Sequence, residues 1–183
     1  MRRRMRVLPR PALTRRAVVA FPENGRLDGI EAFRRRHDPL AAALRAHVTL
    51  VFPFASTLSG LQVATHVRRT CARWPVLPIR LEGVDAYTGE WVHVLVTRGR
   101  ESIIELHDRL YRRALSPFLR REFDYMPHVT IGRAADWPAC EAMVCEARAT
   151  FRRPIDAVLR TLSILALPTD GELFVETEIG LGV

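Results

Sequence analysis

The sequence predicts an α+β fold with largely antiparallel sheets. Short apolar runs rich in β-branched and aromatic residues alternate with longer stretches that have helical spacing. Turn residues join several of the short runs in pairs, which favours hairpins. The second half of the chain also repeats the later part of the first half: a histidine-bearing strand, then a helix, then a strand pair. This repeated order of elements predicts a pseudo-symmetric molecule.

In the first half, strands are predicted from β-branched and aromatic content, and helices from apolar spacing and capping residues. Proline marks the breaks, because it ends a strand but fits the first turn of a helix. The expected elements are a strand over 17–21, a helix over 30–46 interrupted at Asp38-Pro39, a strand over 47–54 stopped by Pro53, a helix capped by Ser59, and paired strands over 76–81 and 91–97.

The same criteria divide the second half. Leucine and isoleucine recur there at helical intervals, and a Pro-Thr-Asp-Gly turn joins the last two apolar runs. The expected elements are a helix over 101–115, a strand over 128–131, a helix over 138–151, and strands over 157–165 and 173–179.

Length and composition are those of one globular domain: 183 residues, 48% hydrophobic and 26% charged. No run approaches the roughly 18 apolar residues that span a bilayer, and the N-terminus lacks the apolar core of a secretory signal. We therefore expect a cytoplasmic monomer without membrane association. Residues 16–183 are expected to form the single domain, preceded by a basic tail over 1–15 that need not be ordered.

The net charge of +8 is concentrated at the N-terminus. All 28 basic residues are arginine, and seven of them fall within the first sixteen residues, where there is no acid. Removing those seven from +8 leaves a body near +1. A flexible basic tail is a weak indicator of any particular partner. Charge alone therefore does not predict a nucleic-acid-binding protein.

The cysteines argue against a disulfide framework and against a zinc knuckle. Cys71, Cys140 and Cys145 are an odd number and show no Cys-x-x-Cys spacing. A zinc site built on the histidines would need a further ligand, and no cluster of fixed spacing offers one. We expect three reduced thiols, no metal and no cofactor.

The most informative residues are two tetrads, His47-Val48-Thr49-Leu50 and His128-Val129-Thr130-Ile131. In a strand, residues two apart point to the same face, so each tetrad sets an imidazole beside a hydroxyl. The aliphatic residues between them point to the opposite face and can enter a core. Average residue usage gives two such tetrads by chance in roughly 1% of chains with six histidines. The pair therefore indicates chemistry rather than two ordinary strand histidines.

Phosphate chemistry suits this pattern. Attack at phosphorus needs one group to take a proton from the nucleophile and another to give a proton to the leaving oxygen. Histidine, with a reference pKa near 6.5, can do either at neutral pH. The threonine hydroxyls can donate to the non-bridging oxygens. The tetrads therefore predict His47 and His128 as general acid and base, with Thr49 and Thr130 beside them.

These paired tetrads resemble those of the two-histidine phosphoesterases, and among them the 2′-5′ RNA ligase (LigT-like) family. The resemblance runs from residue 16 onward and implies a bilobal molecule, with two mainly antiparallel sheets flanked by helices around a central groove. It implies one histidine from each lobe and no metal or cofactor. Phe52 matches an aromatic residue that lies against a nucleobase, and Arg133 a basic residue that contacts substrate. The segment 51–54, Val-Phe-Pro-Phe, departs from the family's aromatic-Leu-Gly ending.

Other side chains are weaker candidates. Tyr125 and Phe123 precede the second tetrad and either stack on a base or enter the core. His93 alternates with apolar residues on a strand, where a structural or surface role competes with lining the groove. Arg120 and Arg121 either border the groove or are solvated. The remaining histidines, His37, His66 and His107, are expected on solvated helix faces.

The resemblance implies an enzyme that opens 2′,3′-cyclic phosphates at RNA or nucleotide ends, with reversible 2′-5′ RNA ligation as a further activity. Two alternatives stay open. One is a phosphodiesterase for a small-molecule cyclic phosphate or a 2′-5′ oligonucleotide, which a near-neutral body fits at least as well. The other is a non-catalytic RNA-binding module, for which two groups titrating near pH 7 have no evident use.

Overall fold

The structure is a computed structural model that describes residues 13–23, 25–169 and 171–182. The predicted tail lies outside the described residues except for its last three. There β1 (Thr14–Ala20) has already begun, three residues before the predicted strand. The α+β class is confirmed, with eight strands and four α-helices in the described part of the chain.

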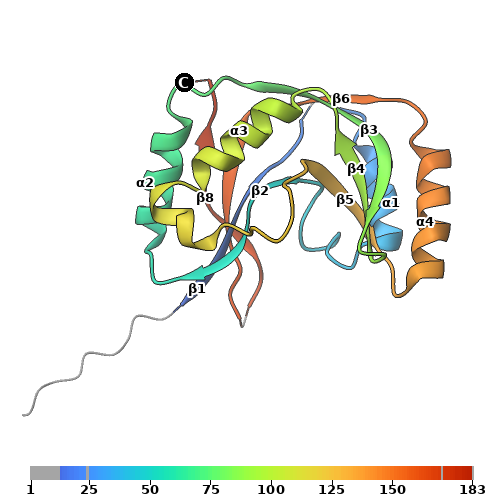
Figure 1. Ribbon diagram of the computed structural model, residues 1–183, viewed down its shortest axis with the longest axis horizontal. Coiled ribbons are helices and arrows are strands. Elements are labelled where there is room, and N and C mark those ends of the chain that lie inside the picture. The colour runs from blue at the N-terminus through green and yellow to red at the C-terminus, as the bar shows by residue number, and fades with distance from the viewer. Residues whose placement is uncertain (1–12, 24, 170, 183) are drawn as a thin grey trace, which may run out of the picture.

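All eight strands join one curled antiparallel sheet (Figure 1). Each half of the sheet holds four strands, and the halves meet where β2 lies beside β5. These inner strands share one ladder position, Val48 opposite Val129. The expected two sheets are therefore two halves of a single sheet. From edge to edge the strands are β6 (Ile155–Leu159), β3 (Leu77–Tyr87), β4 (Trp91–Val96), β5 (His128–Arg133), β2 (Val48–Ser56), β1, β7 (Thr161–Ala166) and β8 (Phe174–Gly180).

The helices divide between the two halves. α1 (Asp28–His37) and α4 (Trp137–Thr150) pack against the half that contains β3, β4 and β5 (Figure 1). α2 (Gly60–Cys71) contacts β8, α3 (Arg100–Leu110) contacts β2, and the two contact each other. A 3₁₀ turn, η1 (Arg113–Phe118), follows α3. The predicted Ser59 cap is confirmed as a capping box with Gln62.

The predicted strand over 157–165 is wrong, because it is two strands. The chain breaks at Arg160, so that β6 pairs with β3 in one half of the sheet and β7 pairs with β1 in the other. Apolar alternation continues across the break, and it carries no information about which neighbour each segment pairs with. The crossover at Arg160 therefore follows from the tertiary structure alone.

Two expected proline breaks also differ. Pro53 does not end β2, because Arg16 pairs with Phe54 and Val18 with Val51, leaving Pro53 in a bulge where no ladder N–H is required. The second helix expected from Asp38-Pro39 does not form, and residues 39–43 make turns instead. The Asp38 carboxylate accepts from the N–H of Leu40, which favours a turn.

A buried arginine on α1 ties down this turn segment and, with it, the approach to the first tetrad. Arg34 is 1% exposed, and its guanidinium donates to both the Asp38 carboxylate and the Leu44 carbonyl at 2.7 Å. Glu31 accepts from the N–H of Ala46 at 2.6 Å. The backbone directly before His47 is therefore held by charged groups of one helix.

We expect Arg34→Ala to lower the free energy of unfolding by about 3 kcal/mol or more, because it leaves a buried carboxylate without its partner. Urea unfolding followed by circular dichroism measures the loss. Arg35→Ala is the matched control: its side chain is exposed on the same helix, and its effect should stay within about 0.5 kcal/mol. Equal effects of the two substitutions would contradict this account of Arg34.

Candidate active site

The ladder position shared by β2 and β5 brings the two tetrads together. Continuing its antiparallel register by one residue in one direction sets Thr49 beside His128. Continuing it in the other direction sets His47 beside Thr130. All four side chains are half-buried, whereas the valines between them are fully buried on the opposite face. The predicted placement of the histidines and threonines on one face, and of the valines in the core, is confirmed.

Both imidazoles are held in the same way. Nδ1 of His47 lies 2.9 Å from the carbonyl oxygen of Arg45, and Nδ1 of His128 lies 2.6 Å from that of Met126. A carbonyl oxygen only accepts, so each Nδ1 carries a proton and donates it. In the neutral ring the free lone pair is then on Nε2. Each histidine therefore offers Nε2 for proton exchange.

Burial sets the acid–base character of the pair. Desolvation lowers the pKa of His128 below its usual value. Desolvation is also the main cause of the lowered pKa of His47, and electrostatic repulsion from His128 lowers it further. Both histidines are mostly neutral at pH 7 in the free protein.

A third histidine stacks on the second tetrad. The ring of His93, on β4, lies 3.7 Å from that of His128 with an interplanar angle of 19°. His93 is buried, and desolvation lowers its pKa to about 3, so it stays neutral. Its Nδ1 is buried without a hydrogen-bond partner in the part of the chain that the structure describes. His93 therefore shields one face of His128 from water.

A cavity of about 400 Å³ opens over this face of the sheet. Its aromatic wall includes Phe52, whose ring meets Phe123 edge-on at 5.4 Å, and the guanidinium of Arg120 lies 5.6 Å above Phe52. His47 is not among the lining residues. Those are Thr49, Phe52, Pro53, Tyr87, Trp91, His93, Arg120, Phe123, Asp124, Met126, His128 and Thr130.

The backbone of β2 beyond the shared ladder position is supported by side chains. The Tyr125 hydroxyl donates to the Thr49 carbonyl, and Nδ1 of His107 donates to that of Leu50, both at 2.8 Å. The Phe52 N–H donates to the hydroxyl of Tyr111 at 2.9 Å. These bonds hold β2 in place where it has parted from β5, and the parting leaves room for the cavity.

Two predicted substrate contacts lie elsewhere. The Tyr125 ring stacks on His107 at 3.6 Å and does not line the cavity. Tyr125 therefore supports β2 through its bond to the Thr49 carbonyl and does not contact the cavity. His107 itself is buried, and its predicted place on a solvated face is wrong. Arg133 is exposed and turns to the Trp91 ring at 4.8 Å and to Glu90 at 3.8 Å. Its side chain therefore braces the wall from outside the cavity.

Two residues of the site, His93 and Arg120, were only weak candidates from the sequence. His93 is on the strand beside the second tetrad, where it pairs with Thr130, but nothing in the sequence shows that β4 neighbours β5. Arg120 follows η1, and nothing in the sequence distinguishes it from the many other arginines.

Across residues 13–23, 25–169 and 171–182, no three His, Cys, Asp or Glu side chains gather where they could hold a metal ion.

Known proteins match this chain over most of its length. A family model described as the 2′-5′ RNA ligase superfamily matches residues 21–170. A protein of Geobacillus kaustophilus, provisionally named a phosphoesterase, is 29% identical over 126 residues, which are 68% of this chain and 70% of that protein. A provisionally named phosphoesterase of Halalkalibacterium halodurans is 30% identical over 119 residues, 63% of this chain and 68% of that protein.

Solved structures share the fold. Escherichia coli LigT complexed with 3′-AMP superposes with a TM-score of 0.61 at 13% identity, covering 93% of this chain and 99% of that one. LigT complexed with NADP⁺ gives a TM-score of 0.60 at 15% identity with the same coverage.

In the part of the chain that the structure describes, no helix combines the length and apolar character needed to cross a bilayer.

Burial of His93 predicts acid-sensitive folding. The unfolded chain binds a proton at this histidine as pH falls below about 6.5, whereas the folded protein resists protonation until about pH 3. The stability that His93 contributes is therefore present above pH 6.5 and is lost as pH falls. From pH 7 to pH 5 this loss is about 2 kcal/mol.

We expect His93→Phe, which keeps the ring but removes the proton site, to be less sensitive to acid over the same range. Urea unfolding at pH 7, 6 and 5 measures the difference. The free energy of unfolding of the variant should fall by about 2 kcal/mol less than that of the wild type between pH 7 and pH 5. Parallel curves would contradict the neutral, buried state of His93.

Proposed function

The chain belongs to the 2′-5′ RNA ligase superfamily, and from that premise we propose that it is a metal-independent phosphodiesterase that opens 2′,3′-cyclic phosphates of RNA ends or nucleotides. The observation that carries the proposal is the matched pair of imidazoles. Each stands at the start of an inner strand with Nδ1 bonded to the carbonyl two residues earlier, which leaves Nε2 for the reaction.

The proposed step is hydrolysis of one P–O bond of the cyclic phosphate. One neutral imidazole takes a proton at Nε2 from the attacking water, and the new oxygen bonds to phosphorus. The other histidine, protonated at Nε2, gives its proton to the 2′ or 3′ oxygen as that oxygen leaves. Both lowered pKa values favour the neutral base form. The negative substrate then favours protonation of the histidine that acts as acid.

The neighbouring side chains suit the phosphate and the base. Thr49 and Thr130 line the cavity with His128, and their hydroxyls can donate to the non-bridging oxygens. Arg120 is the cation that lines this cavity, and it replaces Arg133 in our assignment of the phosphate contact. Phe52 and Phe123 offer aromatic surfaces on which a nucleobase can stack.

The dimensions of the cavity favour a nucleotide-sized reacting group. At about 400 Å³ it is at the lower end of the range for small-molecule sites. LigT, whose fold is similar, forms complexes with 3′-AMP and with NADP⁺. The cavity alone therefore suits a small cyclic phosphate as well as an RNA terminus. The same step with a 5′ hydroxyl in place of water, and with the 3′ oxygen leaving, would form the 2′-5′ linkage.

The decisive test is turnover of a 2′,3′-cyclic mononucleotide in excess EDTA. We expect wild-type turnover to persist, because the proposed proton transfers need no metal. We expect His47→Ala and His128→Ala each to lower kcat/KM by about 10² to 10⁴-fold. His37→Ala, which alters a histidine outside the catalytic cavity, is the control. Complete inhibition by EDTA, or full activity in both tetrad variants, would refute the mechanism.

His93 acts in this scheme as a positioning residue for His128. His93→Ala should admit water beside His128 and raise its pKa toward the ordinary value. One limb of the bell-shaped pH profile of kcat/KM should then move to higher pH. The acidic limb moves if His128 is the base, and the alkaline limb if it is the acid. His93→Phe preserves the stacked ring and should keep the wild-type profile. Identical profiles for all three proteins would exclude this role.

A further inference from the structure

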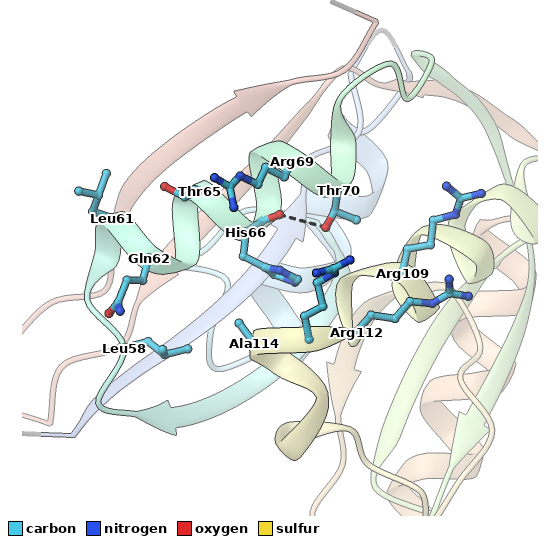
Figure 2. Close-up of a pocket in the computed structure, with 11 residues that line it drawn as sticks. Leu58, Leu61, Gln62, Thr65, His66, Arg69, Thr70, Arg109, Arg112 and Ala114 are labelled. Atoms are coloured by element: carbon cyan, nitrogen blue, oxygen red, sulfur yellow. Dashed lines mark hydrogen bonds between the residues drawn. The ribbon is translucent and has the colours of Figure 1, made fainter.

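A second and larger cavity lies between α2 and the end of α3, and it shares no lining residue with the catalytic cavity. Its volume is about 910 Å³. Figure 2 shows Arg69 on α2, with Arg109 and Arg112 on the opposite wall. Nε2 of His66 lies 2.8 Å from the carbonyl oxygen of Leu110 and ties the two walls together.

The lining of this cavity is strongly basic. Four arginines contribute to it, and no aspartate or glutamate of the described residues does; the four are Arg69, Arg109, Arg112 and Arg113. Arg109 reaches Glu105, outside the lining, at 2.7 Å, and stacks over Trp74 at 5.0 Å. The other three form no ion pair within residues 13–23, 25–169 and 171–182.

Another pair of neighbouring arginines is compensated by an acid. Arg80 and Arg98 lie 3.0 Å and 2.8 Å from the same Asp156 oxygen. The catalytic cavity likewise contains one arginine, Arg120, and one acid, Asp124. Guanidinium groups gathered without a counter-charge repel one another, and a bound anion relieves that repulsion.

Polar groups and backbone geometry add to the case. The Gln62 side-chain oxygen accepts from the N–H of Ser59, which leaves the amide N–H donors of Gln62 for a ligand. Arg113 has a φ of 55°, in the left-handed region that a long side chain rarely adopts. Such strain concentrates at sites where a side chain must be aimed.

The segment that follows α3 contributes to the surroundings of both cavities. The Tyr111 hydroxyl accepts from the N–H of Phe52, which lines the catalytic cavity. Arg109 and Arg112, on either side of Tyr111 in sequence, line the basic cavity. A nucleic-acid strand that occupies both cavities would therefore pass this segment.

We propose that the basic cavity binds backbone phosphates of an RNA strand whose cyclic end occupies the catalytic cavity. This inference rests on the proposed function and makes an RNA strand, rather than a mononucleotide, the preferred substrate. Guanidinium groups bind phosphate through paired N–H donors, and a strand presents several phosphates to several arginines at once.

The test is fluorescence anisotropy with a labelled oligoribonucleotide that ends in a 3′-phosphate, titrated with full-length protein over a salt series. Arg69→Ala/Arg112→Ala should weaken binding about tenfold. The slope of log K against log salt should become shallower by about 1.4, because each single-strand phosphate that an arginine neutralises adds about 0.7 to the slope. The N-terminal arginines are present in every variant, so they do not contribute to the difference.

Arg68→Ala is the matched control, because Arg68 is exposed on the same helix and does not line the cavity. It should leave affinity and slope unchanged. Both altered arginines of the double variant are exposed, so its unfolding temperature should match that of the wild type. Equal binding by the double variant and the control would overturn the proposal. If ATP binds with the same dependence on the two arginines, the phosphate chemistry is supported but the strand is overturned as its source.

Turnover separates this proposal from the previous one. The double variant should hydrolyse a 2′,3′-cyclic mononucleotide like the wild type, and should show a raised KM for an oligoribonucleotide with a cyclic end. An unchanged KM for the oligonucleotide, with normal turnover, would refute the basic cavity alone. Failure of the histidine mechanism would leave the anisotropy result unaffected, because that measurement needs no reaction.

Discussion

One ladder position, Val48 opposite Val129, is the constraint on which the site depends. It joins the two halves of the sheet and sets the register that brings the tetrads together. A shift of that register by one residue would put the imidazole of one strand on the face that the valine of the other strand occupies, and the two imidazoles would no longer share a face. β2 and β5 then part, and Tyr125, His107 and Tyr111 bond the backbone of β2 beyond that point. The cavity occupies the space that this parting leaves.

Desolvation gives the site its chemistry and limits its stability. Burial keeps His47, His93 and His128 mostly neutral at pH 7, which leaves Nε2 of His47 and His128 free for the base catalysis that we propose. The same burial means that acid destabilises the fold, since the unfolded chain binds protons that the folded chain refuses. An anionic substrate counteracts desolvation at whichever histidine must be protonated. Substrate binding and proton loading are therefore coupled in the proposed mechanism.

Arginine serves different purposes in different parts of the molecule. Arg34 is buried with its carboxylate partners and holds the backbone that leads to His47. Arg120 stacks on Phe52 at the edge of the catalytic cavity. Three of the four arginines of the basic cavity lack counter-charges among the described residues, and together the four concentrate positive charge in a protein whose body is near neutral overall. A local site of this kind can attract phosphate without a large net charge.

Apart from the division of residues 157–165 and the helix expected after Asp38-Pro39, the order of elements and their antiparallel character were predictable from the sequence, because apolar spacing, caps and turns indicate them. The face shared by each histidine and threonine was predictable from side-chain periodicity within a strand. Which strands become neighbours was not, because pairing is settled by packing between distant segments. Only the tertiary structure therefore decided that residues 155–166 are divided between the two halves of the sheet and that His93 stacks on His128. It also placed Tyr125 and Arg133 outside the catalytic cavity, and it brought arginines from α2 and α3 together in the basic cavity.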